Sequence, residues 1–532
     1  MRKTVFSIFV LAFVFLVGMP YSVDAQSKRG KHKVVFPVFE TPALFVGEVG
    51  ETDVVLFVDH SDETCISGRY LTLDEDGGDT IPFRLVALRR RARLFYDGNK
   101  ETFRPDILSL DESQAQGVAH LNLIKKMDFS IRSLESPLFE KCDEQRYADS
   151  LFTVKEISDI PYARAKGYWS HLHNSTATFD KISMMTQAID ERLLDLHLDV
   201  FMPEDDTLQS HPLVVLMHGG AFYFGSKDDD AITGWCRHLA SMGYVTASID
   251  YRIGFLPTLP SIQRAGYRAV QDAHAAVRYL VAHHDEYDID TSLIFVGGCS
   301  AGAITALNLA YMTNDSRPEF SYSGFGRNDL GAIDTCGNAI KADFTIKGIV
   351  DMWGALPDTV MMRGSSIPIL AFHGDNDDIV PYAYDYPFRK AGVMKSAFAE
   401  KMYGSSCIVD RAQKMGTPAK LVTFMGYRHS PHLDPQTNEF NDIFYTIQEM
   451  MDEFFYDIIA PDKPAIVEHN KVYSLQPEPL KVSWQVEGGV ILSSEEKAVK
   501  VAWINNAPLR QITVSAVMPH GICFNDSMVI GE

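Results

Sequence analysis

A serine in a short glycine-rich turn is the first residue whose setting points to chemistry. The motif GCSAG at 298–302 follows the apolar run Leu293–Val296 and precedes the helix-like stretch Ala303–Tyr311. This order predicts a strand, a sharp turn and a helix, in which the turn presents Ser300 as a nucleophile. Small residues fit there because larger neighbours would clash in a strained turn. An ordinary glycine-rich turn is the alternative, since G-x-S-x-G also arises by chance.

A second glycine-rich loop lies upstream of this serine. The apolar run Pro212–Met217 predicts a buried strand, and it ends in His218, Gly219 and Gly220. Glycines let backbone N–H groups turn toward an oxygen that becomes negative during a reaction. We therefore predict an oxyanion hole made by the amides of Gly219, Gly220 and Ala301, with His218 bracing the loop as a structural residue.

An acidic segment follows another apolar run. Ile367–Phe372 predicts a buried strand, and residues 373–381 (HGDNDDIVP) come directly after it. Three aspartates compete there for the acid that serves a serine nucleophile. The spacing His-Gly-x-x-Asp-x-x-Val-Pro selects Asp377, with Asp375 as the first fallback and Asp378 as a solvated or capping residue.

A histidine follows one more strand. Ala419–Phe424 predicts that strand, and the loop after it presents His429, with His432 as a rival. The Gly-x-x-His spacing favours His429. Serine is a poor nucleophile until an imidazole removes its proton, and a carboxylate fixes the tautomer of that imidazole. We therefore predict Ser300 as nucleophile, His429 as base and Asp377 as its orienting acid. No metal site is predicted, because the histidines lack the cysteine and carboxylate spacing that zinc requires.

The chain order serine, aspartate, histidine is similar to that of α/β-hydrolases. Residues 150–461 resemble the carboxylesterase-type members, on these motifs and on two further segments, Gly243–Arg252 and Tyr267–Leu280. The resemblance implies a mostly parallel sheet flanked by helices, acyl transfer to water through an acyl-enzyme, and no cofactor. A histidine base implies activity that rises through about pH 6 to 7.

The expected activity is that of a serine esterase, with a small-molecule or polysaccharide-linked ester as substrate. A serine peptidase of the same fold would use the same three residues, and a non-catalytic binding protein could keep the scaffold. The segment Thr313–Asp343 either shapes the substrate pocket or is an exposed connector. Four aromatic residues near the ends of the catalytic strands are candidates for substrate binding: Tyr223, Phe224, Trp353 and Tyr427.

Two β-rich modules are expected around the hydrolase domain at 150–461. Over 26–149, short runs such as Ile81–Ala87 and Ala92–Tyr96 are separated by turn residues and predict strands. Over 462–532, after a proline-containing linker, alternating runs predict a small β-sandwich. That last module resembles PKD-like immunoglobulin-type modules, which implies that its tryptophans are core residues or ligand contacts.

Composition and the N-terminal segment favour a location outside the cytoplasm. Residues 1–25 combine two basic residues, an apolar run and a small-residue cleavage site, which predicts a signal peptide and not a stable membrane anchor. The formal net charge is −21, and removing Arg2, Lys3 and Asp24 makes it about −22. Such an acidic surface disfavours nucleic-acid binding. We expect a secreted, periplasmic or cell-surface protein, and the sequence leaves its oligomeric state open.

Seven cysteines are compatible with an oxidising compartment, although an odd count leaves at least one without an intramolecular partner. Connectivity does not follow from spacing. The candidate pairs are Cys65 with Cys142, Cys236 with Cys299, and Cys336 with Cys407. Cys299, beside the candidate nucleophile, is expected to be packed or disulfide-bonded and not to react.

Overall fold

The computed structural model describes residues 41–531 except 50–51, 63, 73–79, 88–91, 97–98, 111–113, 121–125, 135–136, 144, 173–190, 257, 325, 391–399 and 461. The predicted signal peptide, residues 1–25, lies outside the described residues. The chain forms two compact units. One contains the described residues up to Asp143, Asp462–Pro519 and those from Cys523 onward, and the other contains Glu144–Pro461 and His520–Ile522.

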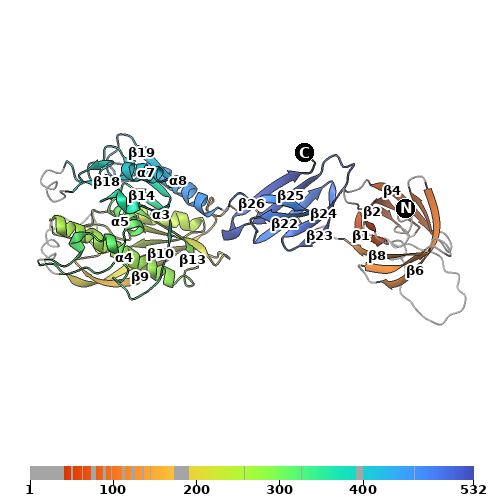
Figure 1. Cartoon of the computed structure of the whole chain (residues 1–532), viewed down its shortest axis with the longest axis horizontal. Coiled ribbons are helices and arrows are strands. Elements are labelled where there is room, and N and C mark those ends of the chain that lie inside the picture. The colour runs from red at the N-terminus through yellow and green to blue at the C-terminus, as the bar shows by residue number, and fades with distance from the viewer. Residues whose placement is uncertain are drawn as a thin grey trace. The chain divides into compact units, whose positions relative to one another are not determined.

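The unit Glu144–Pro461 is built on an eight-stranded sheet of order β19-β16-β14-β13-β11-β12-β10-β9 (Figure 1). Seven of its strands run in the same direction, and only β10 is reversed, since it pairs antiparallel with both β9 and β12. All residues of β11, β12 and β16 are buried, because elements cover both faces of a central parallel strand. The strands are β9 (Val154–Gly167), β10 (Arg192–Pro203), β11 (His211–Met217), β12 (Val245–Ile249), β13 (Ile289–Cys299), β14 (Ile346–Met352), β16 (Ile369–Gly374) and β19 (Ala419–Phe424).

Helices flank this sheet, with α4 against α5 and α3 in contact with α8 (Figure 1). Their bounds are α3 (Asp230–Ser241), α4 (Leu259–Ala282), α5 (Ala301–Tyr311), α7 (Ser405–Lys414) and α8 (Asp442–Ile459). The side chain of Asn441 accepts a hydrogen bond from the N–H of Ile443 and so caps α8. Beside α7 lies a small sheet of β15 (Ala355–Leu356), β18 (Met402–Gly404) and β17 (Tyr384–Asp385). None of the helices in the described ranges is long and apolar enough to cross a membrane.

The predicted fold of this unit, an α/β-hydrolase sheet flanked by helices, is confirmed. The order of its strands also explains how distant residues meet. Strands β13, β14, β16 and β19 are consecutive parallel neighbours. Their carboxyl ends therefore lie along one edge of the sheet, and the loops that follow β13, β16 and β19 are brought together there.

The other unit begins with eight antiparallel strands that close into a barrel. They are β1 (Ala43–Val49), β2 (Thr52–Ser61), β3 (Cys65–Thr72), β4 (Ile81–Ala87), β5 (Ala92–Tyr96), β6 (Asn99–Leu110), β7 (Gln114–His120) and β8 (Lys126–Ser133). Strands β4 and β5 have the bounds that the sequence predicted. The pairing follows chain order around the barrel, since each strand turns back on its predecessor and β8 pairs with β1.

Two further sheets complete this unit after the hydrolase segment, in the orders β20-β21-β24-β23 and β22-β25-β26. Their strands are β20 (Ala465–His469), β21 (Val472–Gln476), β22 (Lys481–Glu487), β23 (Gly489–Glu495), β24 (Ala498–Trp503), β25 (Gln511–Val517) and β26 (Cys523–Val529). Trp484 and Trp503 are both buried, and the Nε1–H of Trp503 donates to the hydroxyl of Tyr473 at 2.8 Å. Both tryptophans are thus core residues. The likeness to PKD-like modules stays a prediction.

The barrel and the C-terminal sheets share a core and a covalent link. Val46, Val55 and Leu71 of the barrel strands pack with Val490 and Ala502. A disulfide joins Cys142 to Cys523, and the remaining cysteines are free. The three candidate pairings made from sequence are therefore wrong. The two cysteines are 381 positions apart in sequence, because the chain leaves this unit, forms the unit Glu144–Pro461 and then returns. Cysteine spacing alone does not reveal such a path.

Candidate active site

Ser300 occupies the sharp turn that joins β13 to α5. Its backbone is at φ 55° and ψ −115°, a region that costs a non-glycine residue free energy and is held by surrounding structure. Two of its neighbours have no room for a side chain. A Cβ on Gly298 would lie 2.5 Å from the carbonyl oxygen of Met217, and a Cβ on Gly302 would lie 2.1 Å from the same atom. The steric reason for small residues that was inferred from the motif is thus present in the structure.

Gly302→Ala is expected to destabilise the hydrolase unit by about 1–3 kcal/mol, because the new methyl group must displace the backbone of β11. Thermal unfolding checks this. Gly266→Ala is the matched control, since its Cβ would meet only ring carbons of Phe222 at 3.8 Å. Alanine also favours the helix by about 1 kcal/mol over glycine. An unchanged melting temperature for Gly302→Ala would contradict the crowded turn.

The three residues predicted to act together lie in one hydrogen-bonded chain. Nε2 of His429 accepts from the Oγ of Ser300 at 2.9 Å, and Nδ1 of His429 donates to Oδ2 of Asp377 at 2.7 Å. Both distances are within normal hydrogen-bond range. The serine follows β13, the aspartate follows β16 and the histidine follows β19, at one edge of the sheet. This geometry permits an imidazole to take the serine proton while a carboxylate fixes its tautomer.

Asp377 is buried and fully bonded. Its Oδ1 accepts from the N–H groups of Ile379 and Val380, at 2.8 and 3.1 Å. Burial alone would raise the pKa of this carboxyl, but hydrogen bonds from His373 and His429 hold it well below its ordinary value. The carboxylate is therefore ionised at neutral pH, as an orienting acid must be.

The rival residues have other partners. Oδ1 of Asp375 accepts from the N–H of Gly426 at 2.5 Å, and Asp378 pairs with Arg428. His432 is buried, and its ring stacks on Trp353 with the centroids 4.9 Å apart. None of these three side chains reaches the serine or its histidine by a hydrogen bond in the described structure.

Because His432 is buried, we expect the stability of the folded protein to depend on pH. Burial, and secondarily the nearby charge of His429, lowers the pKa of His432 from 6.5 to about 4. Between these values the unfolded chain binds a proton that the folded chain does not, so stability falls as pH falls through this window. His432→Phe is expected to reduce the loss of melting temperature between about pH 7 and about pH 5. A variant that loses as much as the parent protein would contradict this assignment.

The predicted oxyanion loop lies against the elbow. A Cβ on Gly219 would be 3.3 Å from the carbonyl oxygen of Cys299 and 3.5 Å from Cβ of Ser300. Gly220 has φ 108°, a conformation that favours glycine. Within the described part of the chain, no acceptor is found for the N–H groups of Gly219, Gly220 or Ala301. The amides of the loop and the elbow are thus without an acceptor, as an oxyanion hole requires.

His218 holds this loop in place through a hydrogen bond and a ring contact. Its Nδ1–H donates to the carbonyl oxygen of Gly219 at 2.7 Å, and its ring stacks on Tyr251 with centroids 4.2 Å apart. The hydroxyl of Tyr251 donates in turn to the carbonyl oxygen of His218 at 2.7 Å. Burial lowers the pKa of His218 to about 4, so its ring is neutral near pH 7, as expected for a structural residue.

Cys299 precedes the serine but points into the core. Its thiol is buried and lies 3.9 Å from the sulfur of Met352. Burial raises the pKa of the thiol well above its ordinary value, so the reactive thiolate is disfavoured. It is free and packed, which is one of the two states expected from sequence.

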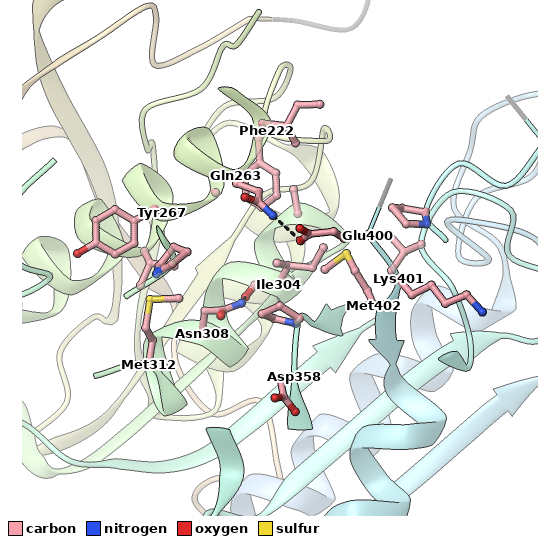
Figure 2. Close-up of a pocket in the computed structure, with 18 of the residues that line it drawn as sticks. Phe222, Gln263, Tyr267, Ile304, Asn308, Met312, Asp358, Glu400, Lys401 and Met402 are labelled. Carbon is pink, nitrogen blue, oxygen red and sulfur yellow. Dashed lines mark hydrogen bonds between the residues drawn. The ribbon is translucent and has the colours of Figure 1, made fainter. Parts of the chain in front are cut away.

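A cavity of about 620 Å³ opens beside Ser300 (Figure 2). One face of α5 forms its floor, because Ser300, Ile304 and Asn308 recur at intervals of four residues. The rise of an α-helix places Asn308 about 12 Å along the axis from Ser300. The other walls are largely apolar and include Phe222, Ile262, Tyr267, Met312, Val360, Met361, Phe388 and Met402.

The four aromatic residues predicted to bind substrate are absent from the described lining of this cavity. Tyr223 is buried against Trp169, with ring centroids 4.9 Å apart. Trp353 is fully buried, while Tyr427 is 47% exposed. Phe224 is half-buried and packs on the hydrolase core. These residues do lie near the ends of the catalytic strands, but the local backbone conformation decides where their side chains point. Trp353, for example, has a positive φ of 50°.

Sequence reasoning missed the residues that do line the cavity. Many come from the first half of α4, a segment that carries no catalytic motif. Gln263 and Glu400 meet at the wall, where the Nε2–H of Gln263 donates to Oε2 of Glu400 at 2.6 Å (Figure 2). Ser316 and Pro318 also contribute, so the segment Thr313–Asp343 shapes the pocket in part. The described ranges contain no cluster of three side chains that could hold a metal ion.

Comparisons with known proteins agree with this architecture. A family profile described as BD-FAE matches residues 198–365. Esterase LipC of Mycobacterium tuberculosis is 28% identical over 206 residues, covering 35% of this chain and 49% of LipC. The probable carboxylic ester hydrolase LipM of the same organism is 30% identical over 209 residues, covering 35% and 46%. The chain thus spans about half the length of these curated relatives.

Solved esterase structures are also among the matches. The propionate-bound esterase 2 of Thermogutta terrifontis is 19% identical, covers 51% of this chain and 92% of its own, and has a TM-score of 0.34. The sheet order and the elbow show that the unit Glu144–Pro461 has the α/β-hydrolase fold, and its sequence is similar to those of esterases.

Proposed function

We propose that this chain is a serine esterase that hydrolyses carboxylic esters through an acyl-enzyme. One observation carries the proposal: Ser300, His429 and Asp377 form a continuous hydrogen-bonded chain beside unpaired amides at a pocket. A serine with only a structural role would not require all three features that Ser300 combines: a strained turn, an imidazole hydrogen-bonded to its hydroxyl, and an adjacent oxyanion loop.

The proposed reaction follows from these positions. The Oγ of Ser300 attacks the ester carbonyl carbon while Nε2 of His429 takes its proton. The carbonyl oxygen becomes negative and is held by the amides of Gly219, Gly220 and Ala301. His429 then gives the proton to the departing alcohol oxygen. Water, deprotonated by the same imidazole, attacks the acyl-enzyme and releases the carboxylic acid and free serine.

The pocket favours substrates with a bulky apolar group over acetyl esters. Its walls are mostly aliphatic and aromatic, and it extends along α5 away from the nucleophile. Each buried methylene contributes about 0.8 kcal/mol. A butyryl ester is therefore expected to exceed an acetyl ester in kcat/KM by about tenfold. Aromatic acyl groups such as feruloyl, whether on carbohydrate or on a small alcohol, fit the same chemistry.

Turnover of matched substrates tests the activity and its size preference. Acetyl, butyryl and feruloyl esters are compared with p-nitroanilides of the same acids. We expect ester turnover with the larger acyl groups preferred, and Ile304→Trp should reduce that preference by filling the floor of the pocket. Preferred cleavage of anilides would indicate a peptidase, and absence of turnover of any of these substrates would contradict the esterase proposal.

We also propose that the protein is exported. The segment 1–25 has the composition of a signal peptide, and the Cys142–Cys523 disulfide suits an oxidising compartment. Expression of the full chain followed by N-terminal mass analysis should find the exported protein beginning at Gln26. Retention of the whole chain in the cytoplasm would contradict export.

A further inference from the structure

A second histidine contacts the carboxylate of Asp377. His373, the fifth residue of β16, is fully buried. Its Nε2 lies 3.3 Å from Oδ2 of Asp377 and 3.3 Å from the carbonyl oxygen of Val380. Because a carbonyl oxygen can only accept, Nε2 of His373 must carry a hydrogen. The same nitrogen lies within ion-pair distance of the carboxylate.

The opposite edge of the same ring is also held. Nδ1 of His373 lies 2.7 Å from Oγ of Ser405, the first residue of α7. The hydroxyl can donate to this nitrogen, which leaves the hydrogen on Nε2. The ring of Tyr382 stands edge-on to His373, with centroids 5.6 Å apart. The orientation and tautomer of His373 are therefore fixed by neighbours from two elements.

Two imidazole nitrogens therefore lie close to Oδ2 of Asp377. His429 approaches it at 2.7 Å from the loop after β19, and His373 approaches at 3.3 Å from β16. A donor to an ionised carboxylate stabilises its charge and makes it a weaker base. The more weakly basic Asp377 is, the less firmly it retains the proton that His429 acquires from Ser300.

We propose that His373 is a positioning residue: its Nε2–H holds Asp377 ionised and directed at His429, and moderates how strongly Asp377 stabilises the protonated form of His429. This inference rests on the proposed esterase function. In the described part of the chain, His373 has no hydrogen bond to the serine; it meets the cavity wall only through the backbone carbonyl of Val380, and the proposed effect runs through the carboxylate.

The other groups around His373 do not replace it. Asp351, near the end of β14, is buried, and burial raises the pKa of its carboxyl. Tyr382 donates or accepts at the hydroxyl of Thr423, 2.8 Å away, and not at the ring of His373. Arg428, whose side chain is exposed, pairs with the buried carboxylate of Asp378, the residue after Asp377. Among the described side chains, that of His429 is hydrogen-bonded to Asp377, and that of His373 lies within ion-pair distance of it.

Two substitutions of similar size separate this role from packing. Glutamine can place its amide nitrogen near the position of Nε2, whereas asparagine places it near Nδ1. His373→Gln should keep kcat within about threefold of the parent protein. His373→Asn should lower kcat by about 10- to 100-fold, the range of a hydrogen bond to a charged group, with KM almost unchanged. The acid limb of the pH profile, meaning the pH at which kcat/KM falls to half its maximum on the acidic side, should rise by about half to one pH unit in His373→Asn only.

Two further variants keep the test decisive. Ser405→Ala retains His373 but removes the hydroxyl that fixes its tautomer, so the acid limb should move in the same direction by less. This variant gives the answer if His373→Asn does not fold, and an unmoved limb then overturns the proposal. His211→Asn is the matched control, because His211 is buried with both ring nitrogens bonded to backbone oxygens away from the site. It should lower stability and leave the profile in place.

The outcomes distinguish this inference from the function on which it rests. If His373→Asn and His373→Gln show the same kcat and the same acid limb, the positioning role is wrong while the esterase proposal stands. A loss of activity in His373→Asn without movement of the limb also overturns it, since packing alone would give that result. Full activity of Ser300→Ala would instead remove the esterase mechanism itself.

Discussion

Ser300→Ala is expected to lower turnover of p-nitrophenyl acetate by on the order of 10⁵- to 10⁶-fold, because alanine has no oxygen to form the acyl-enzyme. The methyl group fits, since it is smaller than the side chain it replaces and the turn already accepts a Cβ at φ 55°. The melting temperature should therefore stay close to that of the parent protein. Steady-state kinetics and thermal unfolding on the same preparation measure both quantities.

Cys299→Ala is the matched control for this loss. The thiol is adjacent in sequence, yet it is buried against Met352 and away from His429. Its removal should leave most of the activity, with a stability cost of the size expected for a small buried side chain, about 1 kcal/mol. Retained activity in Ser300→Ala together with its loss in Cys299→Ala would contradict the assignment of the nucleophile.

Asp377→Asn is expected to lower kcat by on the order of 10⁴-fold with little change in KM. The amide is nearly the same size as the carboxylate, but its nitrogen cannot accept a hydrogen bond from Nδ1 of His429. The imidazole then tends toward the tautomer with hydrogen on Nε2, which cannot take a proton from Ser300. Kinetics across a range of substrate concentrations separates this effect on kcat from substrate binding.

The two neighbouring aspartates provide controls in the same loop. Asp375→Asn removes charge from a carboxylate that accepts from the N–H of Gly426, and the amide oxygen can still accept. Asp378→Asn weakens a pair with Arg428, whose side chain is 65% exposed, so a loss of less than about fivefold is expected. A loss at Asp375 or Asp378 as large as at Asp377 would contradict the choice among the three.

The parts of the fold that follow from hydrophobic patterning were predictable from the sequence. Continuous apolar runs identified β11 and β16, since strands covered on both faces need apolar residues at every position. The shorter, mostly apolar run of β19 also indicated a strand, although this edge strand is only partly buried. Helical spacing identified α8, which begins at Asp442 after its Asn441 cap. Strands β20 and β26 were not predicted, because most of their residues are exposed and their sequences carry no apolar alternation.

The candidate site was predictable to the extent that its residues lie in short motifs. Each of Ser300, Asp377 and His429 follows a recognisable strand, and parallel pairing brings the strand ends together. The pocket walls depend instead on side-chain directions from α4 and from the segment after α5, which no motif fixes. The contact of His373 with Asp377 was hidden for a related reason. Both residues lie in the motif that selected the aspartate, but only the folded backbone shows that the histidine ring turns back onto it.

Reaction with a fluorophosphonate probe tests the central claim most directly, because such probes form a stable bond only with a serine activated by a nearby base. Intact mass analysis of the full chain should show one adduct, and peptide mapping should locate it on Ser300. The adduct should be absent from Ser300→Ala. An unlabelled parent protein, or a label on any other residue, would contradict the account.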